Sequence, residues 1–175
     1  MMFQSEGMGY TSGAGYQTVE LKYDGSELSM VLILPESGTF NAFEDSLTGG
    51  KLQTLIGGLK NTAVNLTMPK FEFDSSFGLK AALTSLGMPI AFSDNADFSG
   101  MDGKTDLQIQ DVVHKAFISV DEAGTEAAAA SGVVVGTTSA PVIEATVTLD
   151  HPFIFAIRDI STGAIVFTGR VTDPS

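Results

Sequence analysis

The 175-residue sequence has no cysteine and no tryptophan, only two histidines, and nine lysine and arginine residues against 21 acidic ones. Without cysteine the chain cannot form disulfides, use a thiol as a nucleophile or build most structural zinc sites. The formal net charge of −12 argues against a nucleic-acid partner, because phosphate-binding surfaces need clustered lysine and arginine. No apolar run reaches membrane-spanning length, so we expect no membrane partner.

The amino-terminal residues Met-Met-Phe-Gln-Ser-Glu also lack the basic start and the apolar run of a secretory signal peptide. Hydrophobic residues make up 43% of the chain and charged residues 17%, a balance that indicates a folded chain rather than a disordered one. At this length one domain is expected.

Periodicity along the chain predicts mostly strands, with a helical block inside them. Residues 1–15 predict a short strand followed by a loop at 11–15. Further strands are predicted over Tyr16–Tyr23, Leu28–Leu34, Val64–Phe73, Leu107–Val120, Val142–Leu149, Phe153–Arg158 and Ala164–Val171. Helices are predicted over Thr39–Leu47, Gly50–Leu59 and Ser76–Leu86. This order favours an α+β fold with mostly antiparallel sheets and a few short helices.

No pattern in the sequence predicts catalysis, a metal or a cofactor. His114 and His151 stand far apart, and neither has another histidine at ligand spacing, so both are read as hydrogen-bonded structural residues. The acidic series Asp94, Asp97, Asp102 and Asp106 breaks the spacing of a calcium-binding loop. No serine lies in the G-x-S-x-G motif of a nucleophile elbow. We therefore expect that the protein is not an enzyme.

The least ordinary stretch is Ser119–Pro141, which is rich in alanine, valine, glycine and threonine and carries no charge after Glu126. Three interpretations stay open from composition alone: a flexible linker, a short helix after Thr125, or a strand that can insert into a sheet. In the extended form one face would carry Thr125, Ala127, Ala129 and Ser131, and the other face Glu126, Ala128 and Ala130.

The run Val147-Thr-Leu-Asp-His-Pro-Phe-Ile-Phe-Ala-Ile157 resembles the signature of the serpin family at every position. Upstream, Val113-His-Lys-Ala116 and Asp121–Ala130 resemble the fifth strand of the serpin sheet A and the hinge of the reactive loop. Met68-Pro-Lys-Phe71, the run 91–101 and the closing run 163–174 are similar to further serpin stretches. The likeness extends over the whole chain, and it corresponds to the carboxyl-terminal half of a serpin.

This resemblance implies a partial serpin domain over 1–175, with an exposed reactive-centre loop at about 122–141. It implies a serine-type endopeptidase inhibitor whose loop is cleaved and then inserts into a β-sheet. The scissile bond expected from the family pattern joins Thr138 to Ser139, and a small residue there favours elastase-like or subtilisin-like proteases. The hinge comprises Gly124, Thr125, Glu126, Ala127, Ala128, Ala129, Ala130 and Ser131, and Lys70 is expected to pair with Glu122 as a restraint on insertion.

Two other interpretations remain beside inhibition: a non-inhibitory serpin-like binding protein, or a degenerate fragment. On its own the fragment is expected to be inactive and to self-associate, because apolar strand faces would lack the rest of the fold. These faces include Leu66, Met68, Phe71, Phe73, Ala116 and Ile118. The resemblance implies an extracellular or periplasmic location, and the lack of a signal peptide leaves a cytoplasmic one open.

Overall fold

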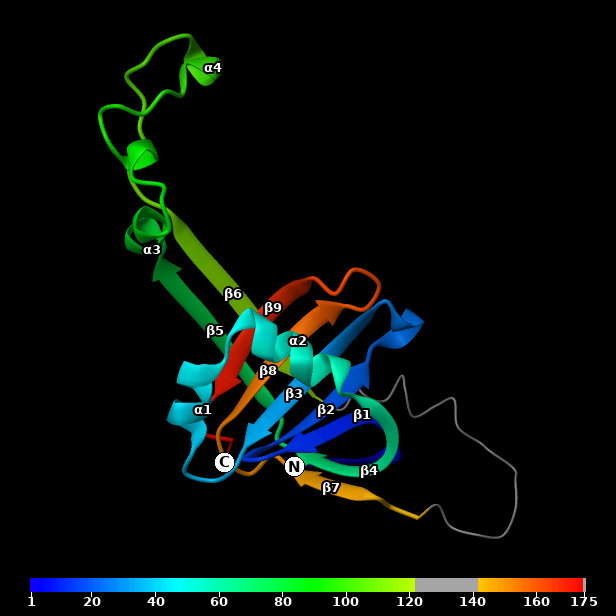
Figure 1. Ribbon diagram of the computed structural model, residues 1–175. Coiled ribbons are helices and arrows are strands. Elements are labelled where there is room, and N and C mark those ends of the chain that lie inside the picture. The colour runs from blue at the N-terminus through cyan, green and yellow to red at the C-terminus, as the bar shows by residue number, and fades with distance from the viewer. Residues whose placement is uncertain (122–141, 175) are drawn as a thin grey trace. The chain divides into compact units, whose positions relative to one another are not determined.

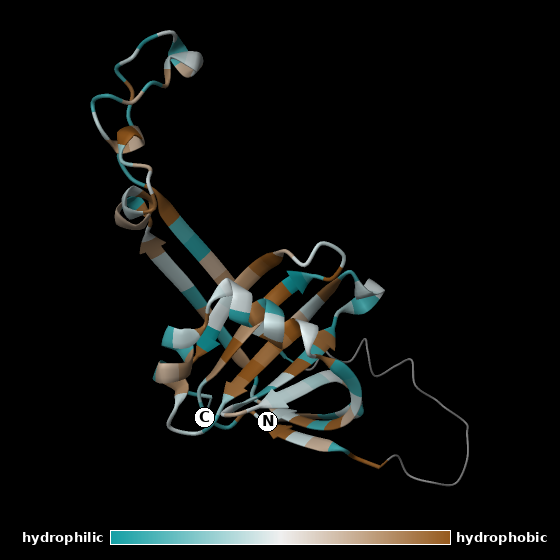
Figure 2. Ribbon diagram, in the orientation of Figure 1, coloured by the Kyte–Doolittle hydropathy of each residue, from teal (hydrophilic) through white to brown (hydrophobic). Residues whose placement is uncertain are grey.

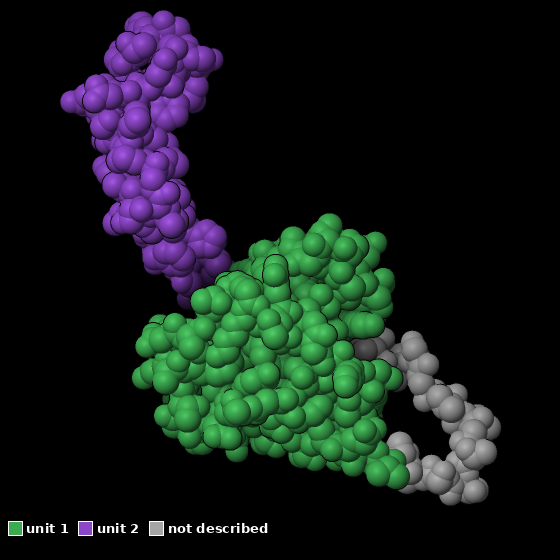
Figure 3. Space-filling view, in the orientation of Figure 1, with its two compact units in different colours: residues 1–71, 120–175 green, residues 72–119 purple. Residues whose placement is uncertain are grey.

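The computed structural model describes residues 1–121 and 142–174. The chain forms two compact units, which are described separately (Figure 3). The larger unit comprises Met1–Phe71 and Val120–Ser175, and the smaller one comprises Glu72–Ser119.

The larger unit contains a seven-stranded sheet in the order β7-β4-β1-β2-β3-β8-β9 (Figure 1). Neighbouring strands pair antiparallel, except that β4 and β7 pair in parallel. A 3-10 turn, η1 (Asp24–Ser26), joins β2 to β3. The strands are β1 (Met2–Gly13), β2 (Tyr16–Lys22), β3 (Leu28–Pro35), β4 (Lys60–Met68), β7 (Ala145–Thr148), β8 (Phe153–Asp159) and β9 (Ile165–Val171).

Alternation along the central strands sorts side chains between the two faces of this sheet. On one face lie fully buried side chains, among them Leu32, Phe153 and Phe155. The other face is covered by the helices α1 (Phe40–Ser46) and α2 (Gly49–Gly57), which pack on Val31, Ile33 and Ile154 through Phe40, Phe43 and Leu55. Figure 2 shows that β3 and β8 are largely hydrophobic, as strands buried on both faces should be.

The smaller unit contains β5 (Phe71–Gly78) and β6 (Val113–Val120), which pair in a two-stranded sheet and reach the larger unit at Phe71 and Val120. Between these strands the chain forms three short helices: α3 (Lys80–Ser85), η2 (Ile90–Phe92) and α4 (Ser99–Asp102). The mostly β-sheet content and few short helices confirm the predicted fold class.

The strand predicted over Val64–Phe73 is wrong, because two strands of different sheets meet there. β4 ends at Met68, and β5 begins at Phe71. Between them Pro69 has no backbone N–H to offer to a ladder, so the strand is interrupted where the chain passes from one sheet to the other.

The helix predicted over Ser76–Leu86 is also wrong over its first part. β5 continues to Gly78, and α3 covers only Lys80–Ser85. The phenylalanines at 71, 73 and 77 follow the two-residue period of a strand, and this period extends into the region where a helical one was expected. The side chain of Leu86, expected on the buried face of that helix, is exposed.

Further boundaries differ from the prediction, since β7 begins at Ala145 where a strand was expected from Val142, and β4 begins at Lys60 where it was expected from Val64. β1 runs to Gly13, where a loop was expected from residue 11, because its last residues pair with β2, with Gly13 opposite Tyr16. Residues 107–112, predicted as strand, are irregular, and the Ile109 N–H donates to the Ala91 carbonyl at 2.9 Å. Strand β6 therefore covers only the second part of the predicted stretch.

The expected exposure of apolar strand faces is wrong for three residues. Leu66 and Met68 are buried within the sheet of the larger unit, and the side chain of Ile118 on β6 is also buried. Phe71 places its ring 5.8 Å from that of Phe153 and 5.6 Å from that of Phe155. The side chains of Leu66, Met68 and Ile118 therefore do not add to an open apolar surface, and Phe71 is half-buried.

Candidate functional site

The sequence places the candidate site in the connection between β6 and β7, and most of its residues lie outside the described part of the chain. These are Glu122, the hinge residues Gly124, Thr125, Glu126, Ala127, Ala128, Ala129, Ala130 and Ser131, and the two residues of the expected scissile bond, Thr138 and Ser139. Their roles remain predictions. The structure describes how the chain is held on either side of this connection.

After the connection, β7 fixes the chain to the large sheet. The Glu144 N–H donates to the Ala63 carbonyl at 2.9 Å, and Ala145–Thr148 then pair in parallel with β4. The Leu149 N–H donates to the Thr67 carbonyl at 2.8 Å. Because the side chains of Val147 and Leu149 are buried, the chain is anchored within a few residues of the expected loop.

Before the connection, β6 ends at Val120, and the Ser119 hydroxyl donates to the Glu72 carboxylate at 3.1 Å. Lys70, the expected partner of Glu122, lies exposed between β4 and β5. The structure thus places the lysine, and the pairing stays a prediction.

The two histidines contact an aromatic ring in one case and hydrogen-bonding groups in the other. The His114 ring lies 5.2 Å from the Phe77 ring within the smaller unit. His151 places Nε2 2.8 Å from the Pro35 carbonyl oxygen and Nδ1 2.6 Å from the Asp150 carboxylate. His151 therefore joins the connection between β7 and β8 to the end of β3. Among the described residues, no three histidine, cysteine, aspartate or glutamate side chains gather as metal ligands would.

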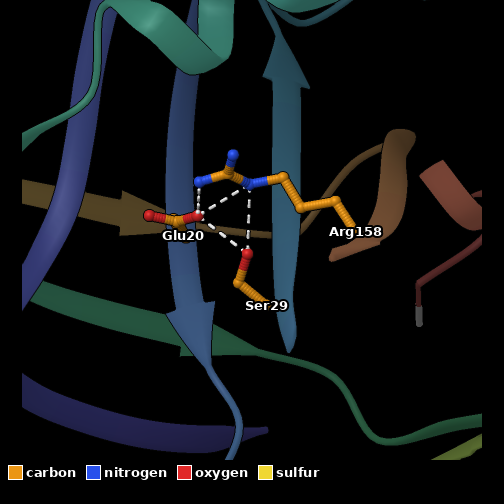
Figure 4. A network of polar contacts seen from close by, with 3 residues as sticks. All are labelled: Glu20, Ser29 and Arg158. Atoms are coloured by element: carbon orange, nitrogen blue, oxygen red, sulfur yellow. Dashed lines mark hydrogen bonds and ion pairs between the residues drawn. The ribbon is translucent and has the colours of Figure 1, made fainter. Parts of the chain in front are cut away.

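A buried polar network links β8 to the strands that precede the connection (Figure 4). The network consists of Glu20 on β2, Ser29 on β3 and Arg158 on β8. The side chains of Ser29 and Arg158 both contact one carboxylate oxygen, Glu20 Oε1. This atom accepts hydrogen bonds from Ser29 Oγ at 2.8 Å, Arg158 Nε at 3.0 Å and Arg158 Nη2 at 2.5 Å. Only 7% of the Glu20 side chain and 15% of the Arg158 side chain are exposed.

Sequence reasoning did not find this network. Glu20 lies inside the predicted strand Tyr16–Tyr23, and Arg158 is the last residue of the predicted strand Phe153–Arg158. The sequence contains one signal, a charge at the end of the apolar stretch Phe153–Arg158. This charge does not indicate that its partner is Glu20, which lies 138 residues away in sequence.

No helix in the described ranges is long and apolar enough to cross a membrane. The described residues form a protein of the sheet-rich class, in which a long connection joins β6 of the small sheet to β7 of the large sheet. Residues 1–174 match the Serpin family, described as serpin (serine protease inhibitor). The chain therefore belongs to the serpin family, which confirms the resemblance read from the sequence. The family's description also agrees with the expectation that the protein is not an enzyme.

Curated relatives and a solved structure support this assignment. The chain is 43% identical over 165 residues to intracellular coagulation inhibitor 2 of Tachypleus tridentatus, covering 94% of this chain and 40% of that protein. It is 40% identical over 184 residues to the human leukocyte elastase inhibitor, covering 99% of this chain and 48% of that one. The crystal structure of tengpin, a thermophilic serpin in its native state, superposes with a TM-score of 0.81 at 38% identity and covers 98% of this chain and 45% of that one. The chain thus spans less than half the length of these serpins.

Proposed function

We propose that the full-length protein containing this chain inhibits serine proteases by offering residues 122–141 as a substrate-like loop. The observation that carries the proposal is the hinge, in which Gly124–Ser131 are all small residues except Glu126. Small residues can enter a sheet over a packed core without clashing, and Gly124 permits the change of backbone direction. A serpin that did not insert its loop would not need this composition.

The chemical step is an acylation by the target protease. The protease serine Oγ attacks the carbonyl carbon of Thr138 and forms an ester as the amide bond to Ser139 breaks. The nitrogen of Ser139 leaves as an amine with the proton taken from the serine. Insertion of a serpin reactive loop into a sheet is a known case of strand addition, and it would carry the acylated protease away before the ester is hydrolysed.

The target class follows from the residue before the cut. Thr138 is small and uncharged, and no lysine or arginine lies between Gly124 and Leu149. Elastase-like and subtilisin-like proteases accept such a residue, whereas trypsin-like ones select a basic side chain. One relative is itself named an elastase inhibitor. An extracellular or periplasmic location fits such targets, and a cytoplasmic one is the alternative, since another relative is named intracellular.

A protease panel tests the proposal. The full-length protein is incubated with pancreatic elastase, subtilisin and trypsin, followed by denaturing electrophoresis. We expect covalent complexes with elastase or subtilisin and none with trypsin. The variant Thr138→Arg should shift complex formation to trypsin, and Thr125→Arg, in the hinge, should turn the protein into a substrate. Complexes of the unaltered protein with trypsin alone would contradict the specificity, and cleavage without any complex would contradict inhibition.

A further inference from the structure

The carboxyl-terminal segment, defined here as residues 142–174, supplies three of the seven strands of the large sheet: β7, β8 and β9. If the chain is cut between residues 138 and 139, no covalent bond joins this segment to the rest. Strand β8 lies between β3 and β9 and carries the fully buried Phe153 and Phe155, so its loss would open the core of the sheet. The inference below rests on the proposed function for this cut.

Side chains of the segment make polar contacts with the preceding chain, among them those of His151, Arg158 and Arg170. His151 contacts the Pro35 backbone carbonyl. Arg170 on β9 forms an ion pair with Glu44 on α1, and 58% of the Arg170 side chain is exposed. Arg158 lies in the buried network with Glu20 and Ser29. An exposed pair contributes little, because water and salt screen it, so the buried network is the contact with the largest consequence if it is broken.

The network also fixes the register of β8. Ser29 and Arg158 lie directly opposite each other in the β3–β8 ladder, and Glu20 reaches them from the next strand. A shift of β8 by two residues would keep apolar side chains on the same faces. It would also remove the guanidinium from Glu20 and leave a buried carboxylate without its cation. The alternation of apolar side chains therefore does not exclude such a shift by itself, and the network opposes it in addition to the packing of individual side chains.

Gly9 on β1 leaves the space that the side chain of Glu20 occupies. Gly9 lies opposite Glu20, and a Cβ on Gly9 would come within 3.0 Å of Glu20 Oε2 and 3.1 Å of Glu20 Cβ. The side chain of Glu20 therefore rests over a position where any larger residue would displace it. By contrast, a Cβ on Gly7 of the same strand would lie 3.1 Å from Oδ1 of the exposed Asn61, whose side chain can turn away.

We propose that Glu20, Ser29 and Arg158 form a latch that holds the carboxyl-terminal segment in register after the loop is cut. The latch deepens the proposed function, because an acylated protease stays trapped only while the scaffold beneath it remains folded. The residues act by positioning β8; none of them touches the protease or the scissile bond.

Retention of the peptide after a cut tests the latch. The full-length protein is cut within 122–141 by a trace of thermolysin, a metalloprotease that forms no ester with its substrate and so is not consumed by the proposed trapping of serine proteases. Hydrolysis consumes one water and leaves a new carboxylate and a new amine. The cut protein is then separated by size exclusion in rising urea at elevated temperature, and mass spectrometry measures the peptide that starts within 122–141. Urea is preferred to guanidinium chloride, which would screen the ion pair by itself.

We expect the unaltered protein to retain the peptide. Arg158→Met should raise the dissociation constant of the peptide roughly 100-fold, because Glu20 would stay buried without a cation. Arg170→Met, the matched control on the same segment, should change it by less than about fivefold. Gly9→Ala should promote release and Gly7→Ala should not. Circular dichroism of the uncut variants shows whether each one folds. If Arg158→Met does not fold, Glu20→Gln takes its place in the retention measurement and should also promote release of the peptide.

Equal retention by Arg158→Met and the unaltered protein would overturn the latch, as would equal release by the Arg170 and Arg158 variants. Equal effects of Gly9→Ala and Gly7→Ala on peptide release would contradict the role of Gly9 in positioning the Glu20 side chain. These outcomes do not depend on inhibition. A protein that retains its peptide through the latch but forms no protease complex would refute the proposed function alone, and a protein that forms the complex while its Arg158 variant retains the peptide normally would refute the latch alone.

Discussion

Gly169 on β9 has no room for a side chain, and Gly169→Ala should destabilise the protein. Gly169 lies opposite Phe155, and a Cβ there would come within 2.5 Å of Cζ and 2.8 Å of Cε1 of the Phe155 ring. The ring cannot withdraw freely, because Phe155 is fully buried and its ring lies 5.6 Å from that of Phe71 and 6.0 Å from that of Phe167. Overpacking of this kind costs about 1–3 kcal/mol.

The effect can be measured by urea denaturation of the uncut full-length protein, followed by circular dichroism. A matched control is Gly57→Ala at the end of α2, where an added Cβ meets nothing within 4 Å, so that variant should be neutral or more stable by up to about 1 kcal/mol. The double variant Gly169→Ala with Phe155→Leu should show a coupling of about 0.5–3 kcal/mol, since the smaller side chain makes room. If Gly169→Ala is as stable as the unaltered protein, or the two changes simply add, the packing described for β8 and β9 is wrong.

Three further predictions concern a titration, the hinge restraint and the chain by itself. The pKa of Asp159 should be about 2, since its carboxylate accepts hydrogen bonds from the Thr162 backbone N–H first of all and from the Ser161 and Thr162 hydroxyls. Because the folded-state pKa is depressed, its stabilising effect should be full above the ordinary value near 3.8 and be lost as pH falls toward 2, and a carboxyl NMR titration giving an ordinary pKa would contradict this. Reversing the charge with Glu122→Lys should promote polymers on mild heating through loss of the proposed pairing with Lys70; unchanged size-exclusion profiles, compared with Glu126→Lys, would count against the restraint. The 175-residue chain expressed alone should self-associate and be cut within 122–141 without inhibiting subtilisin or elastase, whereas a monomer that forms a denaturant-stable complex would refute this.

The sequence predicted best those elements whose pattern is set locally. The strands β2, β3, β8 and β9 begin and end within two residues of the predicted bounds, because alternating or continuous apolar runs end at turns such as the one at Gly25, whose φ is +81°. The helix α2 was also predicted, and the Thr48 side chain accepts a hydrogen bond from the Lys51 N–H at its start.

The prediction failed where long-range pairing decides the structure. Val64–Phe73 has the composition of one strand, and only the separate partners β1 and β6 show that it is two. The length of β1 depends on its pairing with β2 and β4, which its own residues do not signal. Likewise, the buried pair of Glu20 and Arg158 exists only because β2, β3 and β8 are neighbours, and neither charge signals its partner in the sequence.

The candidate site divides in the same way. The composition of the proposed hinge is a local property and could be read from the sequence, as could the family signature around His151. The anchoring of β7 beside β4 in parallel needed the structure, since nothing in Val142–Leu149 specifies that partner.

Trapping of a protease as an ester on Thr138 can be measured by mass spectrometry of the denatured protease complex. We expect one species in which the protease serine is joined to a chain that ends at Thr138, with a separate noncovalent peptide that begins at Ser139. Free active protease together with two unmodified cleavage products, or an ester on a residue outside 122–141, would contradict it.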